Sequence, residues 1–293
     1  MKKILALTMA IAMSLSLAAC GGGNGGAASS KNDASSSNPG AASSAQGGDS
    51  SIASPSEGYG DFTTVEPGKL HMSTNAEFPP YEMTTDAGGF EGIDVEVASA
   101  ICDKLGLELV VDDMGFDAAL TAVQTGQSDI AMAGITVRED RLEVMDFSDS
   151  YATGVQVVIV NEGSPIQTVD DLENAELIGC QKATTGYIYC SDTPENGGYG
   201  EDHVTAYDTG ALAVMALVSG QVDAVVIDNE PAKAYVAENP GLVILDTEFA
   251  VEDYAIGFAK GNDALKDAVN GAMAELKKDG TFQKIVDKYI TAD

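Results

Sequence analysis

The stretch Ala118–Ile130 (AALTAVQTGQSDI) recurs later in the chain as Leu212–Ala224 (LAVMALVSGQVDA). Each copy has the pattern of an apolar helix that ends at Gly-Gln-x-Asp and continues into a short apolar strand. The first strand ends at Gly134 and the second at Asp228, at the same distance from the repeated motif. A repeated helix–strand unit predicts two similar α/β lobes.

Polar residues of opposite charge follow the two repeated strands. Thr136 and Arg141 come after Gly134 and suit an anion, because a guanidinium can hold a carboxylate through two parallel hydrogen bonds. Asp228 ends the second strand, where a carboxylate can accept hydrogen bonds from an ammonium. Ligands of α/β sheets bind beyond the carboxyl ends of the strands. The two strand ends therefore predict a cleft that binds a zwitterion.

Both charged groups also have a simpler explanation. Arg141 could belong to a solvated helix start at residues 138–141, whose charges pair with one another. Asp228 could be the N-cap of a helix that begins near Pro231. Local spacing leaves both explanations open, and a cap and a ligand role are compatible for Asp228.

The N-terminal residues have the pattern of an export signal. Lys2 and Lys3 precede an apolar stretch, Ile4–Leu17, that is short for a membrane span. The following Leu-Ala-Ala-Cys-Gly resembles a bacterial lipobox, which implies that residues 1–19 are removed and that Cys20 carries the lipid. An ordinary secretory signal is the alternative. Residues 20–64 are rich in Gly, Ser and Ala, which predicts a disordered linker at the extracellular face of the cell membrane.

The composition excludes several classes of partner. Lys and Arg number 15 against 46 Asp and Glu, a formal charge of −31, which argues against nucleic acid and anionic lipid surfaces. Only two histidines are present and no ligand cluster surrounds them, so neither a metal nor a cofactor is expected. Cys102 is expected to be a small buried side chain. Cys180 and Cys190 are close enough in sequence that a disulfide between them stays open.

Strand and helix patterns alternate from residue 69 onward, which predicts an α/β fold with mainly parallel sheets. Asp94 is the expected N-cap of a helix that ends at Gly106, and a later helix is expected to end at Gly280. Strands are expected at 70–73, 107–111, 155–160, 176–180, 242–245 and 254–259.

Six motifs that follow one another in order carry a resemblance to a known family. They are 75–82 (NAEFPPYE), 92–95 (GIDV), 133–141 (AGITVREDR), 145–151 (MDFSDSY), 183–186 (ATTG) and 223–228 (DAVVID). Together they resemble the polar amino-acid class of bacterial extracellular solute-binding proteins, family 3, which deliver substrate to ABC importers. The resemblance covers about residues 65–291.

The resemblance implies a type II periplasmic-binding-protein fold, in which each lobe is a mixed sheet flanked by helices. Lobe 1 would comprise 65–153 plus 253–293 and lobe 2 would comprise 154–252, with two hinge strands that allow closure on the ligand. Arg141, Thr136 and Gly134 would hold the ligand α-carboxylate, with help from Thr184 and Thr185. Asp228 would hold the α-ammonium, and Phe78 and Phe116 would enclose the ligand side chain.

Departures from the family pattern bear on selectivity. Asn75 stands where members that bind cationic or amide side chains often have Asp, Gln181 is uncharged and Ile227 offers no polar group. These residues favour a neutral or polar L-amino acid, whereas Glu77 keeps a cationic ligand open. The expected partners are the amino acid and an importer permease, with the chain a monomer and not an enzyme. A tethered amino-acid sensor and a cyclohexadienyl-dehydratase-like enzyme are the alternatives.

Overall fold

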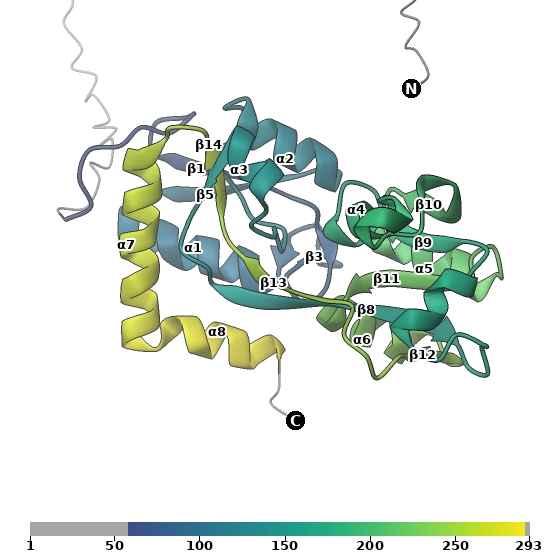
Figure 1. Cartoon of the computed structure of the whole chain (residues 1–293). Helices are drawn as coiled ribbons and strands as arrows, with labels where there is room; N and C mark the ends of the chain where they lie inside the picture. The colour runs from purple at the N-terminus through teal and green to yellow at the C-terminus, as the bar shows by residue number, and fades with distance from the viewer. Residues whose placement is uncertain (1–57, 291–293) are drawn as a thin grey trace, which may run out of the picture. The chain divides into compact units, whose positions relative to one another are not determined.

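A computed structural model describes residues 58–290, which form two α/β lobes joined by a pair of strands (Figure 1). The predicted signal peptide, the predicted lipidation site Cys20 and most of the predicted linker lie outside the described residues. Within 58–290, no helix is both long enough and apolar enough to cross a membrane.

Lobe 1 is built on a five-stranded mixed sheet in the order β5-β1-β6-β14-β7. β1 is parallel to β5 and β6, whereas β14 runs antiparallel to β6 and β7. The strands are β1 (Lys69–Thr74), β5 (Glu108–Asp113), β6 (Ile130–Ala131), β7 (Met145–Phe147) and β14 (Gly257–Ala259). The helices are α1 (Ile93–Leu105), α2 (Phe116–Gln124), α3 (Glu139–Val144), α7 (Asp263–Asp279) and α8 (Thr281–Tyr289), and a small sheet holds β2 (Glu77–Phe78), β3 (Glu82–Thr84) and β4 (Phe90–Glu91).

Lobe 2 has a sheet in the order β10-β9-β11-β8-β12, with β13 also paired to β8. The strands are β8 (Ala152–Asn161), β9 (Ile178–Gln181), β10 (Val204–Tyr207), β11 (Ala224–Asp228), β12 (Leu242–Ile244) and β13 (Ala250–Tyr254). The helices are α4 (Thr185–Ser191), α5 (Gly210–Val218) and α6 (Asn229–Glu238), with short 3-10 helices at η1 (Val169–Asn174), η2 (Pro194–Asn196) and η3 (Glu201–His203).

The two sheets have the same topology. β9, β10 and β11 of lobe 2 take the places of β1, β5 and β6 of lobe 1, and β8 takes the antiparallel place of β14. The repeated helices α2 and α5 therefore precede equivalent strands, β6 and β11. This confirms the two-lobed type II fold with a mixed sheet in each lobe. Most strands of each sheet run in one direction, and one antiparallel strand enters each sheet, β14 in lobe 1 and β8 in lobe 2, because the chain crosses between the lobes.

The Gly-Gln-x-Asp motif has the same structural role in both lobes. Gly126 and Gly220 both adopt φ 70°, a left-handed conformation that ends the helix. The Asp129 carboxylate accepts hydrogen bonds from the backbone N–H groups of Val65 and His71 at 2.7 and 2.8 Å. The Asp223 carboxylate does the same for Glu176 and Leu177 at 2.7 and 3.2 Å. The motif thus fixes the start of the neighbouring strand rather than binding a ligand.

The connection between the lobes consists of the ends of β8 and β13. Ala152 pairs with Tyr254 and Gly154 with Glu252 in an antiparallel ladder, so both crossings lie side by side. A side chain at residue 154 would collide with the Tyr254 ring, so glycine is required where this ring crosses β8. The predicted strand at 254–259 is divided, because β13 ends at Tyr254 and β14 begins at Gly257.

Several local expectations need correction. α1 begins at Ile93 with Gly92 as its N-cap, and Asp94 is instead buried inside the lobe. Cys180 and Cys190 are buried free thiols rather than a disulfide. Packing also begins before residue 65, since Tyr59 and Phe62 lie against the hydrophobic core. Cys102 is buried as expected, and α7 ends at Gly280, which has φ 80°.

Candidate functional site

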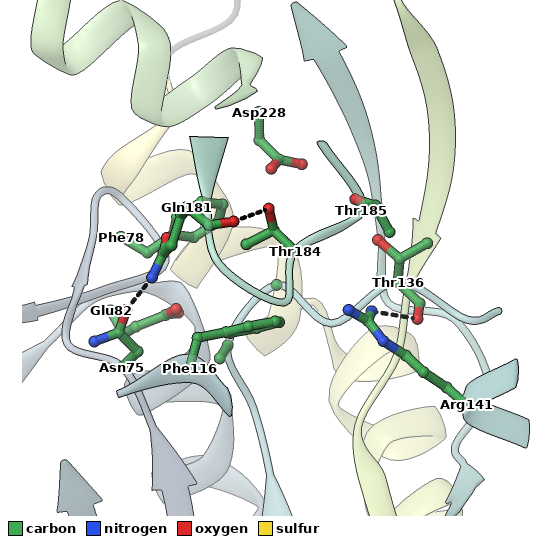
Figure 2. Close-up of a pocket in the computed structure, with 12 residues that line it drawn as sticks. Asn75, Phe78, Glu82, Phe116, Thr136, Arg141, Gln181, Thr184, Thr185 and Asp228 are labelled. Atoms are coloured by element: carbon green, nitrogen blue, oxygen red, sulfur yellow. Dashed lines mark hydrogen bonds between the residues drawn. The ribbon is translucent and has the colours of Figure 1, made fainter. Parts of the chain in front are cut away.

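A cavity of about 330 Å³ lies between the lobes, beyond the carboxyl ends of β6 and β11 (Figure 2). All nine residues predicted to bind the ligand line it, and so does Gln181. The lining consists of Asn75, Phe78, Glu82, Phe116, Ala133, Gly134, Thr136, Arg141, Gln181, Thr184, Thr185 and Asp228.

Arg141 supplies a buried positive charge at one end of the cavity. Its side chain is 6% exposed, and its guanidinium donates to the carbonyl oxygens of Thr136 at 2.9 Å and Ala183 at 3.1 Å. Burial lowers the pKa of this guanidinium to about 10. Within the described residues, Arg141 forms no salt bridge, whereas Arg138 pairs with Asp140 at 2.9 Å. The alternative of a helix start whose charges pair with one another therefore holds for Arg138, whereas Arg141 remains available for an anion.

A carboxylate that the sequence did not single out holds the threonine hydroxyls. Glu252, on β13, accepts from Thr136 Oγ1 at 3.1 Å and from Thr185 Oγ1 at 2.8 Å. Gln156 Nε2 donates to the same Glu252 oxygen at 3.2 Å. A hydroxyl has one proton to donate, so in this state neither threonine can also donate to a ligand. The two hydroxyls, one from each lobe, are joined through a hinge residue.

The loop before α4 contributes through its backbone. Thr184 is the N-cap of α4, and its hydroxyl accepts from the Tyr187 N–H and donates to the Gln181 carbonyl at 2.7 Å. Ala183 adopts φ 61°, which is uncommon outside glycine. Its carbonyl meets the guanidinium of Arg141 from the other lobe. The Thr184 hydroxyl is therefore satisfied within the loop.

Asp228 supplies a buried carboxylate above the centre of the cavity (Figure 2). It occupies the N-cap position of α6, but its side chain makes no capping hydrogen bond. The Tyr254 hydroxyl donates to Asp228 Oδ1 instead, and Tyr254 is fully buried at the hinge. Burial raises the pKa of Asp228 to about 7, while the hydrogen bond from Tyr254 opposes this rise. Tyr254 thus holds the carboxylate in place from the hinge.

Aromatic rings form the apolar walls of the cavity. Phe116, at the start of α2, lies below the Arg141 guanidinium at 5.6 Å from its ring centroid. Phe78 stacks on Tyr81 at 5.8 Å. Gly134 has φ 54°, and a Cβ there would lie 2.8 Å from the Phe78 ring. A glycine is thus required for Phe78 to reach the cavity.

The cavity end away from Arg141 is polar and acidic. Gln181 Nε2 of lobe 2 donates to Asn75 Oδ1 of lobe 1 at 2.8 Å. Glu82 lies beside Asn75 in Figure 2 and is 0% exposed, with no hydrogen-bond donor to either carboxylate oxygen. Sequence reasoning missed Glu82; the available signal was an acidic residue directly after Pro-Pro-Tyr in a predicted ligand loop. A buried carboxylate without a donor is costly unless a cation or a proton reaches it.

The other two residues predicted to set selectivity lie elsewhere. Glu77 has an exposed side chain on β2, and Ile227 packs against Gly210 and the lobe 2 core. Neither lines the cavity. The negative charge near Asn75 that Glu77 was expected to supply can therefore come from Glu82, which lines the cavity.

The lobes are closed around the cavity by direct contacts. The Tyr235 hydroxyl of α6 donates to the Glu77 carbonyl at 2.9 Å, in addition to the Gln181–Asn75 and Arg141–Ala183 bonds. Two lobes, a two-strand hinge and an enclosed cavity with opposite charges at its walls define a solute-binding protein. The sequence matches the bacterial extracellular solute-binding proteins, family 3, over residues 70–292, and the chain belongs to this family.

Named relatives support this assignment. A probable histidine-binding protein of Neisseria gonorrhoeae is 30% identical over 233 residues, which cover 78% of this chain and 86% of the relative. The arginine-binding extracellular protein ArtP of Bacillus subtilis is 31% identical, and the match covers 77% of this chain and 87% of ArtP. The crystal structure of ArtJ from Geobacillus stearothermophilus, an arginine-, lysine- and histidine-binding protein, has a TM-score of 0.71 at 32% identity. The match covers 77% of this chain and 96% of the ArtJ chain.

Proposed function

We propose that this protein captures an L-amino acid with a cationic side chain between its lobes and delivers it to an ABC importer. The observation that carries the proposal is a set of three buried ionisable groups that line the cavity and have no salt-bridge partner among the described residues: Arg141, Asp228 and Glu82. The first two fit the carboxylate and ammonium of a zwitterion. The third fits a positive charge at the end of the ligand side chain.

A zwitterionic ligand would supply partners for Arg141 and Asp228. A ligand α-carboxylate would give Arg141 the anionic partner that it lacks, through charge-assisted hydrogen bonds. A ligand α-ammonium would give Asp228 a donor beside Tyr254. Each pair is buried, so leaving one partner unpaired would cost far more than at a surface.

A cationic ligand side chain would bind at the end of the cavity away from Arg141. Glu82 and Asn75 both lie there, and a guanidinium, an ammonium or an imidazolium could donate to both. The three relatives reported above are named for the binding of histidine, arginine or lysine, which supports the cationic class. This proposal replaces the expectation of a neutral ligand, which rested on Asn75 and Gln181 without knowledge of Glu82.

No catalytic activity is proposed. The cavity lining contains no histidine, cysteine or lysine, and its threonine hydroxyls are engaged with Glu252 or with the α4 cap. A nucleophile–base pair of the kind that a hydrolase needs is therefore missing from the lining. The relatives reported above are named as binding proteins.

Membrane attachment and the permease partner complete the proposal. The lipobox at Cys20 would anchor a monomer to the cell surface, and the linker would let the domain reach a permease. A Cys20→Ala variant should be released from the membrane or remain uncleaved. Mass spectrometry of the mature N-terminus should find lipid on Cys20, and an unmodified N-terminus at another residue would contradict the anchor.

A thermal-shift screen of the twenty L-amino acids followed by calorimetry tests the ligand class. A ligand at 100 times its Kd stabilises the folded protein by about 2.7 kcal/mol, which shifts the melting temperature measurably. We expect arginine, lysine or histidine to give the largest shift. A response to acidic or aliphatic amino acids only would contradict the cationic class, and no response to any amino acid would contradict amino-acid capture.

A further inference from the structure

Two carboxyl groups meet behind the cavity wall. Glu82, on β3, and Asp94, in the first turn of α1, are both 0% exposed. The Asp94 N–H donates to the carbonyl of Tyr81, the residue before Glu82, at 2.9 Å, so the two buried carboxyl groups lie side by side and interact. Glu82 also lines the cavity, whereas Asp94 does not. A ligand can therefore touch one member of the pair while the other stays behind it.

Only one of the four carboxyl oxygens of Glu82 and Asp94 accepts a hydrogen bond from a donor group. Asp94 Oδ2 accepts from the Gly134 N–H at 3.2 Å and from the Tyr151 hydroxyl at 2.8 Å. Asp94 Oδ1 and both oxygens of Glu82 are buried without a donor. Two ionised carboxylates only accept hydrogen bonds, so they cannot satisfy each other. A single proton between them would turn repulsion into a hydrogen bond.

Among residues 58–290, none of the groups whose charge is found to act on the pair is positive. The titratable groups that act on Glu82 or Asp94 from the neighbouring elements are carboxyls and phenols. They are Tyr81 before β3, Asp113 on β5, Tyr151 before β8, Asp228 at the end of β11 and Tyr235 on α6. None of these groups is a cation, so a proton is the neutralising charge closest at hand.

We propose that Glu82 and Asp94 share one proton in the free protein, and that this proton decides whether the cavity accepts a neutral or a cationic side chain. With the proton present, Glu82 is an O–H donor that suits a neutral amide or urea oxygen. With the proton released to solvent, Glu82 is a carboxylate that suits a guanidinium or ammonium. Glu82 is then a specificity-determining residue and Asp94 a positioning residue. This inference rests on the proposed function for its ligands.

The direction of the pKa shifts agrees with this arrangement. Burial raises the pKa of Asp94 to about 6, and burial together with Asp94 raises the pKa of Glu82 well above its ordinary value. The free protein therefore retains the proton near neutral pH. A cationic ligand must displace it, so its binding is favoured as the pH rises, whereas binding of a neutral ligand through the Glu82 hydroxyl is favoured as the pH falls.

Arginine and citrulline form a matched pair of probes, because citrulline is a neutral compound of nearly the same shape. Both carry the same α-carboxylate and α-ammonium, so titration of Asp228 affects them equally and cancels in the ratio of their Kd values. Calorimetry from pH 5.5 to 8.5 should show the preference for arginine rising, by up to about tenfold per pH unit while the pair titrates. Titrations in buffers of different ionisation enthalpy should show more proton release with arginine than with citrulline, because both ligands release the proton of Asp228 and only arginine also releases that of the Glu82–Asp94 pair.

Variants separate Glu82 from the rest of the cavity. Glu82→Gln should weaken arginine relative to citrulline and make the ratio independent of pH. Glu77→Gln, which changes an exposed acid outside the cavity, should keep the pH dependence of the wild type. A wild-type ratio that does not change with pH while arginine still binds would overturn the inference and leave the proposed function standing.

An infrared measurement on the free protein tests the proton without any ligand. At neutral pH, the wild-type spectrum should contain a protonated carboxyl band, beyond that of Asp228, that is missing from Glu82→Gln and shifted in frequency in Asp94→Asn, where Glu82 loses its carboxylate partner. The same band in all three proteins would overturn the shared proton, whatever the ligand. If neither arginine nor citrulline binds, the proposed ligand class fails, and the infrared band still decides between a shared proton and none.

Discussion

Individual buried charges determine what the cavity can hold. Sequence spacing brought out Arg141 and Asp228, because each follows an apolar strand at the same place in a repeat. It left open whether they were solvated or buried, since burial depends on the opposite lobe. Glu82 and Glu252 escaped attention for the same reason: their partners lie on other elements, more than sixty residues away for Thr185 and Glu252.

The two charges that grip the zwitterion can be tested separately. Arg141→Ala and Asp228→Asn should each weaken ligand binding by about 2–5 kcal/mol, because a ligand charge is left buried and unpaired. Arg138→Ala is the matched control, since Arg138 pairs with Asp140 and does not line the cavity. Calorimetry with the identified ligand measures the loss, and circular dichroism checks the fold. Wild-type affinity in either cavity variant would remove that residue from the site.

Two glycines with positive φ allow strain and collision to be distinguished. Gly134→Ala places a Cβ 2.8 Å from the Phe78 ring, so it should lower ligand affinity at least tenfold. Gly126→Ala has a similar φ of 70° and open space around it, so it should cost about 1 kcal/mol of stability and leave affinity unchanged. Affinity loss in both variants would show that backbone strain, not the cavity wall, is responsible.

At the level of elements, helices and strands were predicted well where a hydrophobic period was long. The helix α7 and the strands β1, β8 and β11 lie where the pattern placed them. Asp94 was the exception: a residue type that commonly caps helices here sits one residue inside α1, because its carboxylate is needed by the Gly134 N–H and by Tyr151. The capping preference of a residue type reflects only the local chain, so it does not predict a partner that tertiary structure brings near.

The repeated aspartates should affect stability without affecting binding. Asp129→Ala would leave the N–H groups of Val65 and His71 without their acceptor, and should lower the free energy of unfolding by about 1–3 kcal/mol. Asp223→Ala should do the same for β9, by way of Glu176 and Leu177. Denaturant unfolding gives the stability and calorimetry gives the affinity. A large affinity loss with unchanged stability would show that the motif has a ligand role.

At the scale of the whole molecule, the two lobes could be predicted from the repeat and from the family resemblance. Which strand of each mixed sheet runs antiparallel, and which residues meet at the hinge, could not be predicted, because both depend on where the chain crosses. Tyr254 illustrates this: its sequence context is that of a strand, yet at the hinge its hydroxyl reaches Asp228 at the end of β11 and its ring lies over Gly154. Such contacts have no local signal in the chain.

The pH dependence of stability reports the buried carboxyl of Asp228. Its folded pKa is about 7 against an ordinary 3.8, so the folded state holds a proton that the unfolded state releases. The stability that this proton contributes is present below about pH 4 and is lost as the pH rises through about 7. The free energy of unfolding of the ligand-free wild type minus that of Asp228→Asn should therefore decrease from pH 4 to pH 7. A difference that is constant or increases would contradict the buried, proton-binding state of Asp228.

Closure on a zwitterion is the central claim, and it has a direct test. A ligand that touches Arg141 on lobe 1 and Asp228 on lobe 2 binds the closed state better than the open one, so it must shift the population toward closure. Paired spectroscopic labels, one on each lobe, measure the distance between the lobes as ligand is added. L-arginine should shorten that distance, whereas N-acetyl-arginine and arginine amide, each lacking one of the two charges, should leave it unchanged. Equal shortening by the blocked derivatives would contradict the account.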